Sequence, residues 1–159
     1  MAGVVLEDDG GMEIREVLLT DEVAQTLIAM SAEWEAEDIS YGYQKNERSD
    51  LEGKRIFIAE ENGEIIGFLF GRLEKSKDNG AVVPDGADYF EANEIYVKSA
   101  YRSQGVGSAL FRYMEEQVRP EAEYIMLGTA TKNFRAILHF YINEMGMEFW
   151  SAALFKKLQ

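Results

Sequence analysis

A short segment of glycine, arginine and polar residues is the part of this sequence best suited to chemistry. It consists of Arg102, Ser103, Gln104, Gly105, Val106, Gly107 and Ser108. The segment joins a predicted strand to a predicted helix, and the N–H groups in the first turn of a helix have no partner within that helix. The helix dipole adds a partial positive charge, and glycine lets an anion approach the backbone closely. The segment therefore predicts an anion site, with phosphate as the expected ligand.

The elements on either side would hold this segment in place. Before it, residues 91–98 alternate between two faces, with Glu94 and Tyr96 on one of them, which is the period of a strand. After it, apolar residues recur at helical spacing over 106–114, and Pro120 ends the helix. A strand, a turn and a helix thus follow one another almost without a linker.

Two other glycine motifs do not fit this segment, and one structural explanation of the two glycines stays open. The phosphate loop of nucleotide hydrolases needs Lys-Ser or Lys-Thr after its last glycine, whereas Ser108 and Ala109 follow here. The dinucleotide fingerprint needs a third small residue where this chain has Leu110. The third alternative is a glycine-rich turn that only packs the helix against the strand.

The pattern Arg-x-x-Gly-x-Gly directly after a strand resembles the acyl-CoA pyrophosphate motif of the GNAT superfamily of N-acyltransferases. In that family the preceding strand often looks like Glu94-Ile95-Tyr96-Val97, and an aromatic-arginine pair like Tyr101-Arg102 follows a short turn. The resemblance implies an α/β (α+β) fold with a mixed, mostly antiparallel sheet flanked by helices. It also implies acetyl-CoA as the co-substrate.

The resemblance further assigns the contacts of the cofactor. Two neighbouring strands, expected at 94–98 and 124–128, would splay apart and admit the pantetheine arm between them. The implied cofactor-binding residues are Ile95, Tyr96 and Val97 on the first strand, Arg102, Ser103, Gln104, Gly105, Val106, Gly107 and Ser108 in the turn, and Asn133 at the start of a later helix.

Acetyl transfer from a thioester to an amine needs a base, because an alkyl ammonium with a pKa of about 10.4 is mostly protonated at neutral pH. Glu94 and Glu91 are the candidates, since both lie on or beside the strand 91–98. Alternation places them on opposite faces unless a bulge intervenes, so we expect only one to face the amine. Glu94 is the preferred candidate.

The leaving thiolate also needs an acid, and the resemblance implies Tyr141. In the family, four residues usually lead from this tyrosine to the glycine that ends the helix, but Gly146 lies five residues after Tyr141. A bulge, or a shift of the role to Phe140, would change the assignment. The alternative is that Tyr141 is a core aromatic residue.

The pattern along the chain predicts one domain over residues 1–159, beginning with a loose arm over 1–11. The predicted order is a strand at 12–17, a helix at 21–34, strands at 55–60 and 64–72 joined by a hairpin at Glu61-Asn62-Gly63, a surface loop at 75–88, the strand and helix around the anion site, a strand at 124–128, a helix from Asn133 to Gly146, and a last strand at 147–158.

Composition limits the chemistry and the partners. The chain has no cysteine, which excludes disulfides and a cysteine nucleophile, and its only histidine, His139, lacks neighbouring ligands, so we expect no metal site. The net charge of −13 opposes binding to nucleic acid or to an anionic membrane. No signal peptide or apolar span is visible, and a cytoplasmic location is expected.

The acceptor would be a small-molecule or peptide amine. An acidic and aromatic segment follows the first predicted helix and includes Trp34, Glu35, Glu37, Asp38, Tyr41 and Tyr43. We hypothesise that it binds a cationic amine, and the alternative is a solvated helix end. The aromatic residues Phe149, Trp150 and Phe155 could pair two copies into a homodimer.

The sequence thus predicts an acetyl-CoA-dependent N-acetyltransferase that works by direct attack of a primary amine in a ternary complex. A non-catalytic acyl-CoA-binding sensor module is the alternative from another functional class, since it would keep the glycine turn without a base or an acid. A partner-binding domain with no cofactor is the third hypothesis.

Overall fold

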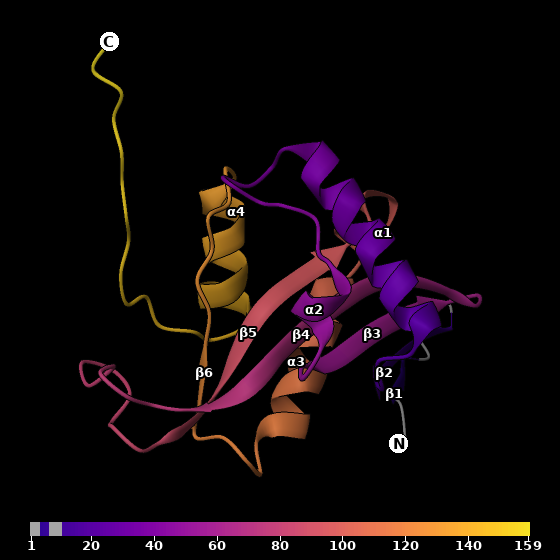
Figure 1. The fold of residues 1–159 in the computed structure, drawn as a ribbon, viewed down its shortest axis with the longest axis horizontal. Coiled ribbons are helices and arrows are strands. Elements are labelled where there is room, and N and C mark those ends of the chain that lie inside the picture. Colours follow the sequence, from indigo (N-terminus) through magenta and orange to yellow (C-terminus); the bar gives the residue numbers. More distant parts are fainter. Residues whose placement is uncertain (1–3, 7–10) are drawn as a thin grey trace.

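The computed structural model describes residues 4–6 and 11–159, which form a mixed sheet with helices on both faces (Figure 1). Within these residues the sheet has six strands in the order β1-β2-β3-β4-β5-β6, and every neighbouring pair is antiparallel except β5 and β6. The strands are β1 (Val4–Leu6), β2 (Met12–Val17), β3 (Arg55–Glu61), β4 (Glu64–Lys75), β5 (Asp88–Val97) and β6 (Tyr124–Met126). The predicted mixed, mostly antiparallel sheet is confirmed.

The helices are divided between the two faces of this sheet. They are α1 (Asp21–Glu37), the short α2 (Arg48–Leu51), the 3-10 turn η2 (Ser99–Tyr101), α3 (Val106–Val118), α4 (Phe134–Leu138) and the π-helix η3 (His139–Glu144). One apolar cluster packs α1 against the sheet through Leu27, Met30 and Phe68. The other packs α3 against the opposite face, and its centre includes Leu110 and Met114.

The hairpin between β3 and β4, predicted from Asn62-Gly63, is confirmed. Both residues have positive φ, 50° and 77°, which is the conformation of a type I′ turn. The loop over 75–88 is confirmed as well, since β4 ends at Lys75 and β5 begins at Asp88.

A β-bulge in β5 changes which residues share a face. Gly71 of β4 pairs with Ala92 and Phe70 pairs with Glu94, so Asn93 is an extra residue in β5. Because of this extra residue, Glu94 lies on the same face of the sheet as Glu91. This is the face that α1 covers. We expected the two carboxylates on opposite faces unless a bulge intervened. The bulge is present, and the two carboxylates share one face.

Gly71 makes this bulge sterically possible. A Cβ atom at Gly71 would lie 2.0 Å from the carbonyl oxygen of Glu91 and 2.8 Å from the Phe90 ring. Any side chain here would force the two strands apart. The bulge and the glycine opposite it are thus one structural unit.

The strands β5 and β6 separate after a short ladder, as expected for the splayed pair. Their parallel pairing runs from Tyr89–Tyr124 to Glu91–Met126 and stops there. β5 continues to Val97 and is paired on its other edge with β4 alone. In the described residues, the backbone of Ile95 to Val97 therefore has one edge free of a neighbouring strand.

The two ends of the chain differ from the prediction. The loose arm over 1–11 is wrong for Val4–Leu6, which pair with β2 as an edge strand; residues 1–3 and 7–10 lie outside the described residues. The strand predicted at 147–158 is absent, because this segment runs away from the sheet without pairing with β6 (Figure 1). The helix predicted from Asn133 to Gly146 forms, but its second half is a π-helix.

We predict that Gly71→Ala lowers the free energy of unfolding by about 1–3 kcal/mol, because the new Cβ overlaps the backbone of β5. Gly80→Ala is the matched control: Gly80 lies in the 75–88 loop, where an added Cβ would meet no atom within 4 Å, and should change stability by less than about 0.5 kcal/mol. Urea unfolding of both variants measures the effect. Equal stability of the two would contradict the steric role of Gly71.

Candidate active site

Glu94 is held by two hydrogen bonds from the segment that follows α1. The Tyr43 hydroxyl donates to Glu94 Oε1 at 2.8 Å, and Asn46 Nδ2 donates to the same oxygen at 2.9 Å. Burial raises the pKa of the Glu94 carboxyl, and the two hydrogen bonds only partly oppose this shift. The carboxyl therefore takes up a proton more readily than an exposed glutamate does.

The second oxygen of Glu94 is open. Among the described residues, no hydrogen bond reaches Oε2. In the same residues, every fully buried side-chain oxygen has a hydrogen-bond partner. Glu94 is only partly buried, so its second oxygen is not sealed inside the protein. Glu94 combines a raised pKa, one anchored oxygen and one accessible oxygen, which are the properties required of a general base.

Buried polar contacts connect this anchoring to α1. The backbone N–H of Asn46 donates to Ser31 Oγ at 2.9 Å, and that hydroxyl donates to the Ile28 carbonyl at 2.7 Å. Ser31 and Asn46 are both buried. Position and orientation of the Glu94 carboxyl thus follow from the packing of α1 on the sheet.

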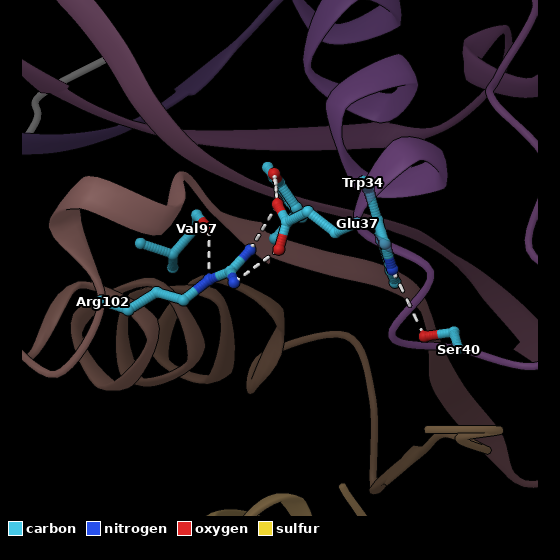
Figure 2. Close-up of polar contacts among 6 residues, drawn as sticks. Trp34, Glu37, Ser40, Val97 and Arg102 are labelled. Carbon is cyan, nitrogen blue, oxygen red and sulfur yellow. Dashed lines mark hydrogen bonds and ion pairs between the residues drawn. The ribbon is translucent and has the colours of Figure 1, made fainter. Parts of the chain in front are cut away.

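Aromatic stacking fixes the other side of the same segment. The Trp34 ring stacks on Tyr43 with centroids 3.9 Å apart and on Tyr96 with centroids 5.3 Å apart. Trp34 Nε1 also donates to Ser40 Oγ at 3.3 Å (Figure 2). Tyr43 belongs to the segment after α1 and Tyr96 belongs to β5. Trp34, which stacks on both rings, therefore holds the segment against β5.

The segment after α1 also meets the chain that follows β6. Ser40 and Thr131 form an isolated antiparallel bridge, Tyr41 N donates to the Ala130 carbonyl at 2.9 Å, and Lys132 N donates to the Ile39 carbonyl at 2.9 Å. These contacts connect residues 39–41, on the α1 side of the sheet, to residues 130–132, which follow β6.

Arg102 is engaged with Glu37 at the end of α1. Its guanidinium makes a bidentate pair with the Glu37 carboxylate at 2.6 and 2.9 Å, and its Nε donates to the Val97 carbonyl at 2.9 Å (Figure 2). The Tyr96 hydroxyl donates to Glu37 as well. Burial alone would raise the pKa of the Glu37 carboxyl, but the hydrogen bonds from Arg102 and Tyr96 outweigh it and the pKa is lowered.

The turn predicted to bind an anion leaves the first amides of α3 without a side-chain cap in the described part of the chain. Gly105 precedes α3 in the left-handed region with φ 85°, and no side chain caps the helix among the described residues. Amides at the start of α3, from Val106 to Ser108, thus remain available. Gly67 of β4 allows α3 to come close, because a Cβ at this position would lie 3.1 Å from Leu110 and 3.2 Å from Val106.

Tyr141 lies on the other side of the sheet from Glu94. It is buried in the cluster of α3, and its ring centroid is 6.2 Å from that of Phe111. Burial raises the pKa of Tyr141 to about 12. Phe140, by contrast, lies beside the anion site, and its ring would be 3.7 Å from a Cβ added at Gly107. The structure does not bring Tyr141 and Glu94 into contact.

The π-helix accounts for the unusual spacing between Tyr141 and Gly146. A π-turn inserts one residue relative to an α-helix, and η3 ends at Glu144, just before Gly146 with φ 77°. The extra residue is therefore absorbed inside the helix. Asn133 is exposed at the start of α4, where its backbone N–H donates to Thr131 Oγ1 at 3.1 Å.

The acidic and aromatic segment has structural partners that the sequence did not reveal. Besides Glu37, Asp38 pairs with Lys132 at 3.0 Å and Glu35 accepts the backbone N–H of Lys45 at 2.6 Å. Asn46, which anchors Glu94, is absent from the sequence-based candidates, because a single asparagine in a polar stretch carries no signal for burial.

Metal-binding clusters and membrane-spanning helices are both absent from residues 4–6 and 11–159. No group of three or more His, Cys, Asp and Glu side chains there could hold a metal ion. None of the helices in the same residues is long and apolar enough to cross a membrane.

Comparisons with known proteins agree with the fold. The model of the acetyltransferase (GNAT) family matches residues 18–147. The aminoglycoside acetyltransferase meta-AAC0020 from an uncultured soil metagenomic sample, solved in complex with sisomicin, is similar with a TM-score of 0.66 and 14% identity, over 93% of this chain and 97% of that chain. No curated protein sequence matches the chain.

Two further structures show the same similarity of fold. A ribosomal-protein-alanine N-acetyltransferase from Brucella melitensis biovar Abortus 2308 has a TM-score of 0.64 and 14% identity, over 91% of this chain and 99% of that chain. The aminoglycoside N-acetyltransferase AAC(6')-Iy in complex with CoA has a TM-score of 0.63 and 17% identity, over 92% and 98%.

We predict that Glu37→Gln lowers the free energy of unfolding at pH 7 by about 1 kcal/mol, because the bidentate pair with Arg102 is lost. A lowered carboxyl pKa stabilises the fold above the ordinary pKa of about 4.3, and this contribution is lost as the pH falls through the folded-state value. The difference between wild type and variant should therefore close in acid.

Denaturant unfolding between pH 3 and pH 7 measures this dependence. Glu33→Gln is the control on the same helix, since Glu33 is more exposed and its Oε1 lies 3.9 Å from Lys98 Nζ. We expect it to change stability by less than about 0.5 kcal/mol at any pH. A Glu37 variant that behaves like this control would show that the pair with Arg102 contributes nothing.

Proposed function

Because the chain belongs to the acetyltransferase (GNAT) family, we propose that it transfers an acetyl group from acetyl-CoA to a primary amine by direct attack in a ternary complex. The observation that carries this proposal is the partly buried Glu94, with one oxygen anchored by Tyr43 and Asn46 and the other open. A module that only binds acyl-CoA has no use for such a carboxyl.

The residues present fit acetyl-CoA at two places. The uncapped amides at the start of α3 suit its diphosphate. The edge of β5 that β6 leaves unpaired, at Ile95, Tyr96 and Val97, would offer backbone groups to its pantetheine arm, with the Val97 carbonyl already bonded to Arg102 Nε. The cofactor supplies the activated acetyl group as a thioester. Arg102, Ser103 and Gln104 lie in the turn beside these amides, and Asn133 lies at the start of α4; they complete the proposed cofactor site.

In the proposed reaction Glu94 Oε2 takes a proton from the attacking amine. The amine nitrogen forms a bond with the acetyl carbon, the carbon–sulfur bond breaks, and the sulfur receives a proton. The raised pKa of Glu94 makes it a stronger base than an exposed carboxylate. Glu91 shares its face and is the second candidate.

Tyr141 remains the candidate acid in this proposal. Its pKa of about 12 keeps the hydroxyl protonated at neutral pH, which a proton donor needs. Its place in the α3 cluster means that the hydroxyl would have to reach the sulfur from the side of the sheet opposite Glu94.

The acceptor is proposed to be a small molecule or a peptide with a cationic amine. The net charge of −13 favours a cation in general, and Glu91 and Glu94 add two carboxylates on the face that α1 covers. The similarity to an aminoglycoside acetyltransferase solved with sisomicin supports an aminoglycoside as the first acceptor to test.

We predict that Glu94→Gln lowers kcat/KM by 10²- to 10⁴-fold, the usual contribution of a general base. The variant keeps an oxygen that can accept the bonds from Tyr43 and Asn46, so the fold should persist. A raised carboxyl pKa means that ionisation destabilises the fold, and wild type should lose stability as the pH rises from about 4.3 through the folded-state value, whereas the variant should not.

Thiol release from acetyl-CoA with sisomicin and with an alanine-terminated peptide measures this activity. Glu91→Gln is the matched control and should lose much less. If wild type binds acetyl-CoA and releases no thiol with any amine, the chain is a non-catalytic binding module. If Glu91→Gln abolishes turnover and Glu94→Gln does not, the two carboxylates exchange roles.

We predict that Ser108→Asp raises the Kd for CoA at least 10-fold, because a carboxylate in the first turn of α3 takes the place of the diphosphate. The same carboxylate favours the helix dipole, so stability should be unchanged or higher. Ser108→Asn has nearly the same shape without the charge and is the control. Titration calorimetry with CoA compares the two, and equal affinities would place the diphosphate elsewhere.

A further inference from the structure

Lys54 is a partly buried lysine that has no carboxylate partner. Its Nζ forms neither an ion pair nor a hydrogen bond within residues 4–6 and 11–159. Every other lysine and arginine there either forms an ion pair or is exposed to solvent. A charge that is partly removed from water costs free energy unless an opposite charge or a hydrogen bond compensates it. In a chain with 29 acidic residues, an unpaired cation of this kind indicates a site for an anionic group of a ligand.

The turn between α2 and β3 fixes the position of Lys54. Gly53 in this turn has φ 72°, and Lys54 N donates to the Leu51 carbonyl at 3.3 Å. Leu51 is fully buried in the apolar cluster that packs α1 against the sheet, and Phe70 of β4 belongs to the same cluster. Lys54 Nζ lies 5.7 Å from the centroid of the Phe70 ring. The turn and the ring together hold the ammonium on the face of the sheet that α1 covers.

The contact with Phe70 places this ammonium next to Glu94. Phe70 pairs directly with Glu94 of β5, and residues opposite one another in an antiparallel ladder project to the same face. Burial raises the pKa of the Glu94 carboxyl, and the charge of Lys54 acts on that carboxyl in the opposite direction. Asp50, which is also nearby, does not pair with Lys54, because its Oδ2 accepts the backbone N–H of Glu47 at 2.8 Å. The candidate base and an unpaired cation are therefore neighbours.

We propose that the acceptor is a free amino acid, whose amine gives its proton to Glu94 and whose carboxylate pairs with Lys54 Nζ. This inference rests on the proposed function and names the acceptor class of the same site. The amine and the carboxylate of an amino acid lie a few bonds apart, which suits two neighbouring groups of opposite charge. The products are the N-acetylamino acid, the thiol of CoA and the proton released from the ammonium, and the carboxylate keeps its charge throughout.

The charges on this face favour such an acceptor over one that carries amines alone. A purely cationic acceptor at Glu94 would bring a further positive charge towards Lys54, whereas the carboxylate of an amino acid complements it. Arg72 lies in register with Glu91 on the same face, but it is exposed and pairs with Glu74. Lys54 is thus the cation beside Glu94 that an acceptor carboxylate can reach without breaking an ion pair.

Acceptors that differ only in the carboxylate test the proposal. The common L-amino acids, each paired with its carboxamide, are assayed by thiol release from acetyl-CoA. The ratio of kcat/KM for an amino acid to that for its amide is compared between variants, because the different amine pKa values of the two acceptors cancel in that comparison. Lys54→Gln should lower this ratio at least 10-fold, mainly by raising KM for the amino acid, since a charge-assisted hydrogen bond is lost. Lys54→Arg keeps the charge and should retain most of the ratio.

Lys77→Gln is the matched control for the change in net charge. Lys77 is exposed in the loop over 75–88, and its replacement should leave the ratio as it is in wild type. Thiol release with none of these acceptors, and none with sisomicin, would overturn the proposed function. Thiol release with a ratio that Lys54→Gln changes no more than Lys77→Gln does would overturn only the present inference.

Binding of the N-acetylamino acids gives a measurement that does not depend on turnover. These compounds carry the carboxylate without a titratable amine, so their affinity reports the contact with Lys54 alone. Because no side-chain or backbone group within the described ranges bonds to Lys54 Nζ, Lys54→Gln should fold as wild type does. Titration calorimetry should show a Kd at least 10-fold higher in Lys54→Gln and an unchanged Kd in Lys77→Gln. Equal values in the two variants would contradict the proposed pair.

Discussion

The bulge at Asn93 is the constraint on which the rest of the site depends. One extra residue in β5, opposite a glycine that lacks the atom that would clash, brings Glu91 and Glu94 to the face covered by α1. Past the bulge, β5 continues to Val97 after β6 has stopped, so the candidate base and the open strand edge arise in the same stretch of chain. Without the bulge, Glu94 would face α3 and the apolar cluster behind the sheet.

Polar contacts from α1 reach both the candidate base, Glu94, and the turn that contains Arg102. Ser31 orders Asn46 and through it Glu94, while Glu37 at the end of the same helix holds Arg102. Because the charge of Arg102 is matched by Glu37, the anion site proposed at the start of α3 would depend mainly on the backbone dipoles of that helix. The glycines matter for that reason, since they leave those dipoles uncovered.

Local signals made much of this predictable from the sequence. Asn62-Gly63 predicted its hairpin, and the glycine pair with the following apolar period predicted α3 and its uncapped start, because each depends on neighbouring residues alone. The bulge, the burial of Asn46 and the pairing of Glu37 with Arg102 depend on strands and helices distant in sequence, and no local pattern encodes them. The last strand was predicted from composition, but a strand also needs a partner, and residues 147–159 pair with no strand among the described residues.

The stacking of Trp34 gives the molecule a natural optical reporter. The chain has two tryptophans, one between Tyr43 and Tyr96 beside the candidate base and the other at position 150 in the half-exposed C-terminal segment. The two indoles have different surroundings, since Trp34 is enclosed by two aromatic rings and Trp150 is about half exposed to water. Their fluorescence emission should therefore differ. Fluorescence from one position thus follows events around Glu94, and fluorescence from the other follows the fate of the chain end, in the same unlabelled sample.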